Sequence, residues 1–153
     1  MIKLLNQSKN IRNFMYMNHN IKTNRNERLK LYQIFEGKSW ITIEYGTNGH
    51  KFDNYINNIY NHKFVICPEG NGIDTHRTWE TLYMGTIPIE KRNINNQFYI
   101  DLPICFVNDW NKITEKFLES EYIRIKQSML DTDKLDFKYW KNKININEFS
   151  SCN

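Results

Sequence analysis

Cysteine is scarce in this sequence, and its spacing forms no motif. The 153 residues include three cysteines, Cys67, Cys105 and Cys152, and no two of them make a Cys-x-x-Cys pair. We strongly favour buried cysteines in a reduced protein over a disulfide framework as the basis of the fold. Cys67 and Cys105 lie in apolar runs, which is typical of small buried side chains in a reduced protein.

Long hydrophobic runs and metal-like histidine spacings are also missing. The first residues, MIKLLNQSKNIRNF, contain no apolar region of signal-peptide length, and no run approaches the about 20 residues of a membrane-spanning helix. We therefore expect a soluble, cytoplasmic protein. The four histidines have no zinc-like spacing with each other or with cysteine, so we predict no metal site.

The six glycines do not form either of two common phosphate-binding motifs. The loop after the first predicted strand, NHNIKTNRNER, has no glycine, which excludes the dinucleotide-binding fingerprint. No Walker A sequence occurs. The Asp-x-Asp sequence at 131–133 follows the last predicted helix instead of a sheet strand, so we interpret it as a turn at the end of that helix.

Charge of one sign is not concentrated. There are 21 basic and 17 acidic residues, which gives a net charge of +4. A dedicated nucleic-acid-binding protein usually carries a denser basic stripe. A solvated surface explains the basic clusters at 22–28 and 138–143 equally well. Nucleic-acid binding is therefore the less favoured alternative.

What is present is an alternation of short apolar runs with segments of helical spacing. Hydrophobic residues make up 40% of the chain, enough for a folded core. The predicted strands are 11–18, 40–45, 63–67, 86–89 and 103–107, and the predicted helices are 24–37, 52–62, 75–84 and one that begins near Asp109. This alternation predicts an α/β fold, a single Rossmann-like doubly wound domain with a mostly parallel sheet. We assign residues 1–141 to this domain and residues 142–153 to a polar C-terminal tail.

The stretch CPEGNGIDTHRTWE, residues 67–80, follows a continuously apolar predicted strand. Ligands of open α/β sheets bind at the carboxyl ends of the strands. Gly70 and Gly72 lack the side chains that would keep a ligand from the backbone. Asp74 is a candidate cap of the next helix, whose first amides favour an anion. Arg77 lies in the first turn of that helix, where a guanidinium suits phosphate oxygens.

Glu80 follows Arg77 by three residues and lies beside it on one helical face. Its two carboxylate oxygens match the adjacent hydroxyls of a ribose, so the pair suits a nucleotide. Trp79, Leu82 and Tyr83 point in other directions and are expected in the core. A surface ion pair between Arg77 and Glu80, with glycines that merely turn the chain, is an equally open alternative from spacing alone.

The segment FVICPEGNGIDTHRTWETLYMGTIPI resembles the exostosin-like glycosyltransferases. The donor half of that family carries a Phe-x-x-x-Pro-x-Gly…Arg-x-x-Glu-Ala-x-x-x-Gly-x-x-Pro pattern, matched here at Phe64, Pro68, Gly70, Arg77, Glu80, Gly85 and Pro88. Segments 23–35 and 101–110 also resemble that family, so the likeness covers most of residues 11–125. The sequence departs from the pattern at Thr81, where the family usually has alanine.

The resemblance implies the nucleotide-sugar-binding domain of a GT-B glycosyltransferase, which moves a sugar from a UDP- or GDP-linked donor to a hydroxyl acceptor. Arg77 would contact the diphosphate and Glu80 the ribose or sugar. The other implied or candidate donor-site residues are Glu69, Gly70, Asn71, Gly72, Asp74, Thr75, His76 and Arg28. Arg28 opens the first helix with Arg25 and would assist from across the cleft; an ordinary solvated charge explains its position at least as well. Enzymes of this architecture usually stabilise the leaving diphosphate with basic side chains and helix dipoles, so no metal or other cofactor is expected.

The sequence has room for one Rossmann-like domain, whereas GT-B enzymes have two. The catalytic base commonly comes from the other, acceptor-binding half, so we assign no catalytic residue. A partner chain, a second copy or an open face would supply the acceptor site. Two functions therefore remain open: the donor domain of a glycosyltransferase, or a non-catalytic or degenerate module that binds a nucleotide sugar.

Overall fold

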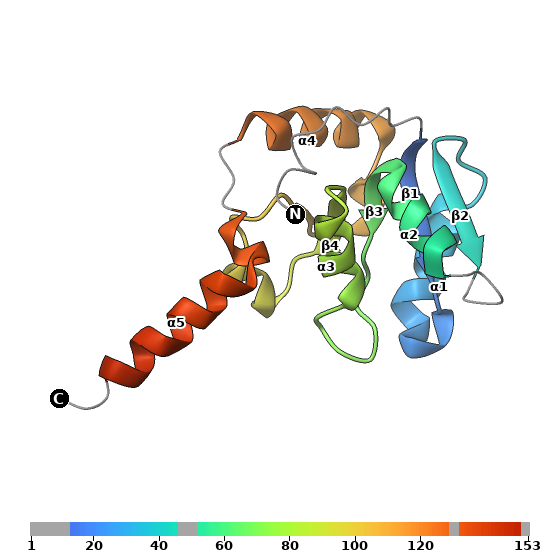
Figure 1. Cartoon of the computed structure of the whole chain (residues 1–153). Helices are drawn as coiled ribbons and strands as arrows, with labels where there is room; N and C mark the ends of the chain where they lie inside the picture. The colour runs from blue at the N-terminus through green and yellow to red at the C-terminus, as the bar shows by residue number, and fades with distance from the viewer. Residues whose placement is uncertain (1–12, 46–51, 129–131, 151–153) are drawn as a thin grey trace.

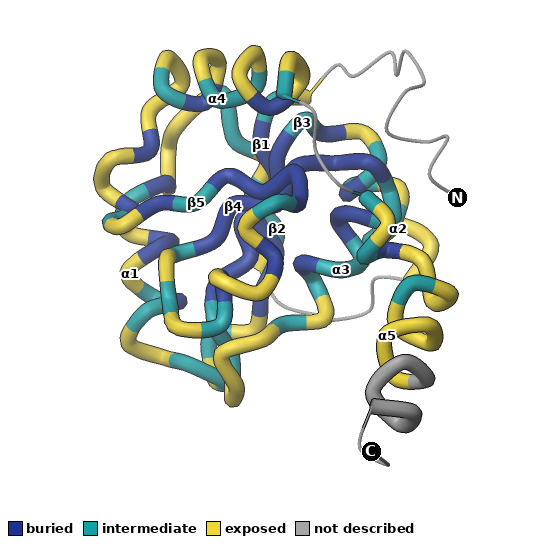
Figure 2. The backbone as a smooth tube through the Cα atoms, turned by 90° about the vertical axis from the view of Figure 1, so that its left-hand side faces the viewer, coloured by how far each residue is buried: buried dark blue, intermediate teal, exposed yellow. Residues whose placement is uncertain are grey.

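Five strands form one all-parallel sheet in the order β2-β1-β3-β4-β5. The computed structural model describes residues 13–45, 52–128 and 132–150, and side chains up to residue 144. The strands are β1 (Asn13–His19), β2 (Ile41–Tyr45), β3 (His62–Ile66), β4 (Ile87–Lys91) and β5 (Cys105–Val107). β1, β3, β4 and β5 are mostly buried, whereas β2 at the edge of the sheet is half-buried or exposed (Figure 2). The sheet has hydrophobic strands because helices cover both of its faces.

The helices alternate with the strands and pack on both faces (Figure 1). One face is covered by α1 (Arg25–Phe35) and α4 (Glu115–Gln127), and the other by α2 (Phe52–Tyr60) and α3 (His76–Tyr83). This arrangement confirms the predicted α/β class, a doubly wound Rossmann-like domain. Short 3-10 helices complete the connections: η2 (Ile21–Thr23), η3 (Ile94–Phe98), η4 (Trp110–Lys112) and η5 (Asp133–Leu135).

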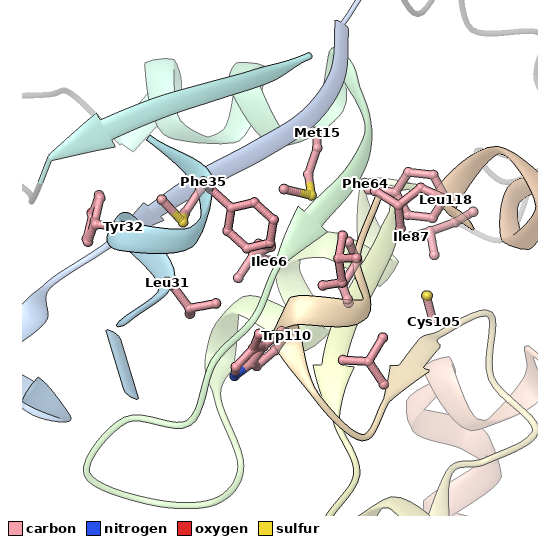
Figure 3. Packing of buried hydrophobic residues seen from close by; sticks show 14 of the residues in the cluster. Met15, Leu31, Tyr32, Phe35, Phe64, Ile66, Ile87, Cys105, Trp110 and Leu118 are labelled. Carbon is pink, nitrogen blue, oxygen red and sulfur yellow. The ribbon is translucent and has the colours of Figure 1, made fainter. Parts of the chain in front are cut away.

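The main core lies between the sheet and the α1–α4 layer. Figure 3 shows Met15, Phe64 and Ile87 of the strands meeting Phe35 of α1 and Leu118 of α4. All five side chains are 3% exposed or less. Residues of alternate parity along β1 and β3 point to the opposite face, where a smaller cluster packs under α2 and includes Tyr16, Ile59, Val65 and Cys67.

Two glycines end helices as their positions in the sequence predict. Gly37 follows α1 with a φ of 79°, and Gly85 follows α3 with a φ of 66°. Side chains other than glycine rarely adopt this left-handed conformation. Both helices therefore stop within two residues of their predicted ends.

The helix predicted to start near Asp109 begins later. Asp109 caps the 3-10 helix η4, because its side chain accepts a hydrogen bond from the amide of Asn111. The long helix α4 starts at Glu115 after a second cap, Thr114, which accepts from the amide of Phe117. Of the Asp-x-Asp sequence, Asp133 opens η5 in place of the predicted turn, and residue 131 lies outside the described residues.

A further helix, α5 (Phe137–Ser150), extends away from the sheet (Figure 1). It passes through residue 142, where a polar tail was predicted to begin, so residues 142–150 are helical. Within the described ranges, no helix has both the length and the apolar character needed to cross a membrane.

Leu118→Ala should lower the free energy of unfolding by about 2–5 kcal/mol, because Leu118 is fully buried between α4 and the sheet and its loss leaves a cavity. Urea denaturation measures the change. Lys116→Ala on the exposed face of the same helix is the matched control and should alter stability by less than about 0.5 kcal/mol. Equal effects in both variants would contradict this packing.

Candidate functional site

The strand order creates a crevice between β1 and β3. From β1 the chain passes to β2 on one side, whereas β3 lies on the other side of β1. The loops that follow β1 and β3 therefore separate at the carboxyl edge of the sheet, where ligands of such folds bind. The second of these loops is the Gly-Asn-Gly segment singled out in the sequence.

A cavity of about 620 Å³ opens at this point. It is lined by the loop after β1, the Gly-Asn-Gly loop, and the facing ends of α2 and α3. The lining residues are Asn18, Asn20, Thr23, Arg28, Phe52, Tyr55, Gly70, Asn71, Gly72, Asp74, Thr75, His76, Arg77 and Glu80. Nine of the ten predicted site residues are in this set, and Glu69 is outside it.

Arg28 joins the two loops. Its Nε donates to the carbonyl oxygen of Glu69 at 2.9 Å, and Nη2 donates to that of Pro68 at 3.2 Å. Nη1 donates to the carbonyl oxygen of Asn20 at 2.9 Å and to Thr23 Oγ1 at 2.5 Å. Protein oxygens thus take up four of the five N–H groups of a guanidinium that is 7% exposed. Arg28 therefore ties the two loops together, and its contact with a ligand from across the cleft stays a prediction.

Gly70 lies directly against this guanidinium. A Cβ atom at position 70 would be 2.8 Å from Nη2 of Arg28, closer than side-chain atoms can approach. Gly72 has no such neighbour, since its nearest atom would be the carbonyl oxygen of Asp74 at 3.8 Å. Of the two loop glycines, Gly70 is therefore required by the close approach of Arg28.

Arg77 and Glu80 meet through Tyr55 of α2. Tyr55 Oη donates to Glu80 Oε2 at 2.6 Å and accepts from Arg77 Nε at 3.3 Å. The guanidinium also lies 5.7 Å from the centre of the Tyr55 ring. Among the described residues Arg77 and Glu80 form no ion pair, so the surface-pair alternative is not what the structure contains. Burial raises the pKa of Tyr55, which therefore remains a protonated donor.

The start of α3 differs from the prediction at Asp74. The N-cap is Thr75, whose hydroxyl lies 3.3 Å from that of Thr78 and makes no capping bond to an amide. Asp74 Oδ1 instead accepts a hydrogen bond from Trp79 Nε1 at 3.1 Å. The predicted capping role of Asp74 is therefore wrong, because the indole nitrogen that becomes its partner lies one turn along the helix.

Of the remaining predicted residues, three line the cavity and Glu69 does not. Asn71, Gly72 and His76 are exposed where they line the cavity. The Glu69 side chain turns away from the cavity, because Oε1 accepts a hydrogen bond from Asn93 Nδ2 at 3.1 Å. Glu69 thus contributes its backbone carbonyl to the Arg28 tie rather than a carboxylate to the cavity.

The sequence pattern did not identify five of the lining residues: Asn18, Asn20, Thr23, Phe52 and Tyr55. Phe52 and Tyr55 lie three residues apart in α2, a spacing that by itself indicates only the apolar face of a helix. Phe52 is 67% exposed and forms an aromatic pair with Tyr55. An exposed aromatic ring beside a polar cavity is a signal for ligand contact, but it appears only after the helix is folded.

His19, the last residue of β1, is buried next to the cavity wall. Its Nε2 lies 3.3 Å from the carbonyl oxygen of Arg28, so Nε2 carries the proton and donates. Nδ1 is buried without a hydrogen-bond partner among the described residues. Burial, together with the nearby charges of Arg77 and Arg28, lowers the pKa of His19 to about 3. His19 is therefore neutral at physiological pH.

A buried carboxyl group, that of Glu90, is hydrogen-bonded to the buried side of α3. Glu90 of β4 is 6% exposed and accepts hydrogen bonds from Thr78 Oγ1 of α3 and from Asn96 Nδ2, the latter at 3.0 Å. Burial, together with the negative charges of Asp74 and Glu69, raises the pKa of Glu90 to about 7. The position of Thr78, next to Arg77, is thus coupled to a group that titrates near neutrality.

The candidate site contains the side chains for an organic anion and no obvious cation cage. Across the described part of the chain, no three histidine, cysteine, aspartate or glutamate side chains come together to hold a metal ion. A scan against protein-family models and a search of curated proteins gave no match to this chain.

Gly70→Ala should destabilise the protein by about 1–3 kcal/mol, because the added methyl group forces the hydrogen-bonded guanidinium of Arg28 to move. Thermal or urea unfolding measures this change. Gly72→Ala is the matched control, since its Cβ has room and its φ is not left-handed. It should be neutral or slightly stabilising. A harmless Gly70→Ala would show that Arg28 is not held in place.

Glu90 should make stability depend on pH between about 4.5 and 7. The folded chain retains a proton that the unfolded chain releases in this window. Its stabilising effect is therefore complete below the unfolded pKa and is lost as pH rises through the folded pKa. Relative to Glu90→Gln, which stays neutral, the wild type should lose about 3 kcal/mol of unfolding free energy from pH 4.5 to 8. Parallel stability–pH curves of the two proteins would contradict this expectation.

Proposed function

We propose that the cavity binds the nucleoside diphosphate of a sugar donor, and that the chain acts as the donor-binding part of a glycosyltransferase. The observation that carries the proposal is the Arg77–Tyr55–Glu80 arrangement at the carboxyl edge of the sheet. It places a cation and an anion side by side, and the Nη nitrogens of Arg77 and Oε1 of Glu80 have no hydrogen-bond partner in the part of the chain that the structure describes. The experiments below test both parts of the proposal.

Arg77 suits the phosphates. Its Nε contacts Tyr55, whereas Nη1 and Nη2 have no hydrogen-bond partner among the described residues. The side chain is half-buried in the cavity wall at the first turn of α3. A guanidinium fork donates to two phosphate oxygens at once, and the first amides of a helix favour the same anion.

Glu80 suits the hydroxyl groups of the ligand. Tyr55 occupies Oε2, and Oε1 has no partner among the described residues. A carboxylate accepts hydrogen bonds but donates none, so it repels phosphate and favours ribose or sugar hydroxyls. Since Arg77 and Glu80 lie on one helical face, the diphosphate and a hydroxyl-bearing ring would sit next to each other, as they do in a nucleotide sugar.

The resemblance to exostosin-like glycosyltransferases favours a sugar donor over other organic anions, because Arg77 and Glu80 are the matching positions of that family's pattern. The volume of about 620 Å³ is in the usual range for a small-molecule site. The positive charge of Arg77 would stabilise the departing diphosphate without a metal ion. The acceptor would approach from the open side, with its site supplied by a further domain or chain.

Titration calorimetry with UDP, GDP, CMP and their common sugar conjugates tests the binding proposal. We expect saturable binding of one diphosphate and its conjugate. Arg77→Ala and Glu80→Ala should each weaken it by about tenfold or more, because each removes a charge-assisted hydrogen bond. Both variants should stay folded, since neither side chain is part of the core.

Arg92→Ala and Glu119→Ala are the matched controls: both residues are exposed and lie outside the cavity, so affinity should be unchanged. A folded wild-type protein that binds none of these nucleotides would refute the proposal. Release of the nucleoside diphosphate from a bound donor, when a panel of hydroxyl acceptors is added, would distinguish a transferase from a module that only binds.

A further inference from the structure

A buried polar network lies under α2 and reaches the cavity at Asn18. Tyr16 Oη donates to Glu44 Oε2 at 2.5 Å. Asn18 Nδ2 donates to Tyr16 Oη at 2.9 Å and to Glu44 Oε2 at 3.1 Å. The other carboxylate oxygen, Glu44 Oε1, accepts from Asn58 Nδ2 at 2.8 Å. Tyr16 is fully buried and Asn18 is 4% exposed, so this network belongs to the interior.

The network fixes which way the amide of Asn18 faces. Glu44 is a carboxylate and can only accept, so the Asn18 atom that contacts it is the amide nitrogen. Tyr16 Oη and Glu44 Oε2 lie 2.5 Å apart, so both accept from the same side of that nitrogen and share one of its N–H groups. The carbonyl oxygen, Oδ1, consequently points the other way and cannot exchange places with the nitrogen without breaking both bonds.

Oδ1 faces the cavity. Asn18 is one of the residues that line it. No described residue donates to Oδ1, and within the described part of the chain the only buried side-chain nitrogen or oxygen without a partner is Nδ1 of His19. Oδ1 is therefore an accessible, unpaired acceptor in the cavity wall, carried by a side chain that is almost completely buried.

We propose that Asn18 is a specificity-determining residue that requires a hydrogen-bond donor on the ligand, a hydroxyl or a ring N–H group, at the β1 side of the cavity. This inference rests on the proposed function, in which the ligand is a nucleotide sugar. Phosphate oxygens carry no proton at neutral pH and are repelled by Oδ1. The acceptor on β1 and the guanidinium of Arg77 on α3 thus fix the direction in which the ligand lies.

Rigidity makes this acceptor selective. A mobile side chain would turn to suit a ligand without the donor, whereas Asn18 is held by Tyr16 and Glu44. A ligand that lacks the donor leaves Oδ1 dehydrated and unpaired, and sites of this kind reject such analogues strongly. Tyr16 and Glu44 do not line the cavity, so they act as positioning residues for Asn18.

The test compares the bound nucleotide and its sugar conjugate with analogues that each lack one donor: the 2′-deoxy, 3′-deoxy and base-N-methylated nucleotides, and deoxy-sugar conjugates. For the wild-type protein, calorimetry should show that one of these analogues binds at least about tenfold more weakly. Which analogue it is identifies the ribose, the base or the sugar as the group that Asn18 recognises. In Asn18→Leu, which has similar size but no acceptor, the parent and that analogue should bind within about threefold of each other.

Asn58→Ala is the matched control: it removes a donor from the same carboxylate without touching Asn18 or the cavity, so the preference should remain. Wild-type protein that binds the parent nucleotide and every analogue equally would refute the role of Asn18 alone, even if Asn18→Leu does not fold. Loss of the preference in Asn58→Ala as well as in Asn18→Leu would also refute it. Absence of binding to every parent nucleotide would refute the proposed function together with this inference.

Discussion

The geometry of the candidate site depends on one buried guanidinium. Arg28 gathers the carbonyl oxygens of Pro68, Glu69 and Asn20 into a single set of hydrogen bonds and thereby joins the loops that follow β1 and β3. No carboxylate pairs with it among the described residues, so backbone dipoles and a hydroxyl must stabilise the charge. Burial lowers the pKa of Arg28 as a result. Gly70 is the sequence feature that allows the guanidinium to approach so closely.

Successive side chains of β1 point to opposite faces of the sheet, so some pack in the main core and others reach the cavity. Met15 and Met17 point to the main core under α1, and Tyr16 and Asn18 point to the opposite face under α2. The second pair brings a buried polar network to the edge of the cavity. Tyr16 and Glu44 both hold the amide nitrogen of Asn18, which favours a single arrangement of this part of the cavity wall. Glu44, from the outermost strand, therefore influences a site that it does not line.

Sequence alone predicts the fold well, because hydrophobic period and glycine position are local signals. Residues that meet only after folding are harder to identify. Tyr55 and Glu80 are 25 positions apart, and Asn18 and Glu44 are 26 apart, so no local pattern connects them. The predicted capping role of Asp74 is wrong for the same reason, because its actual partner is near it only in the folded helix. Its local position favours a cap, but the indole of Trp79 competes successfully for its carboxylate.

The two arginines of the cavity differ in how many of their N–H groups the described protein atoms bind. This contrast favours a ligand-binding role over a purely structural role for Arg77. Arg28 donates hydrogen bonds to protein oxygens through all three of its nitrogens, whereas the Nη nitrogens of Arg77 have no partner among the described residues. The two guanidinium groups are also close together, so the charge of Arg77 adds to the effect of burial in lowering the pKa of Arg28. Two like charges held together at a cavity cost folding free energy unless an anion sits between them. A direct Arg77–Glu80 ion pair would relieve that repulsion, but Tyr55 takes up the facing Nε and Oε2. The Nη nitrogens of Arg77 therefore remain open to an anionic ligand such as the proposed diphosphate.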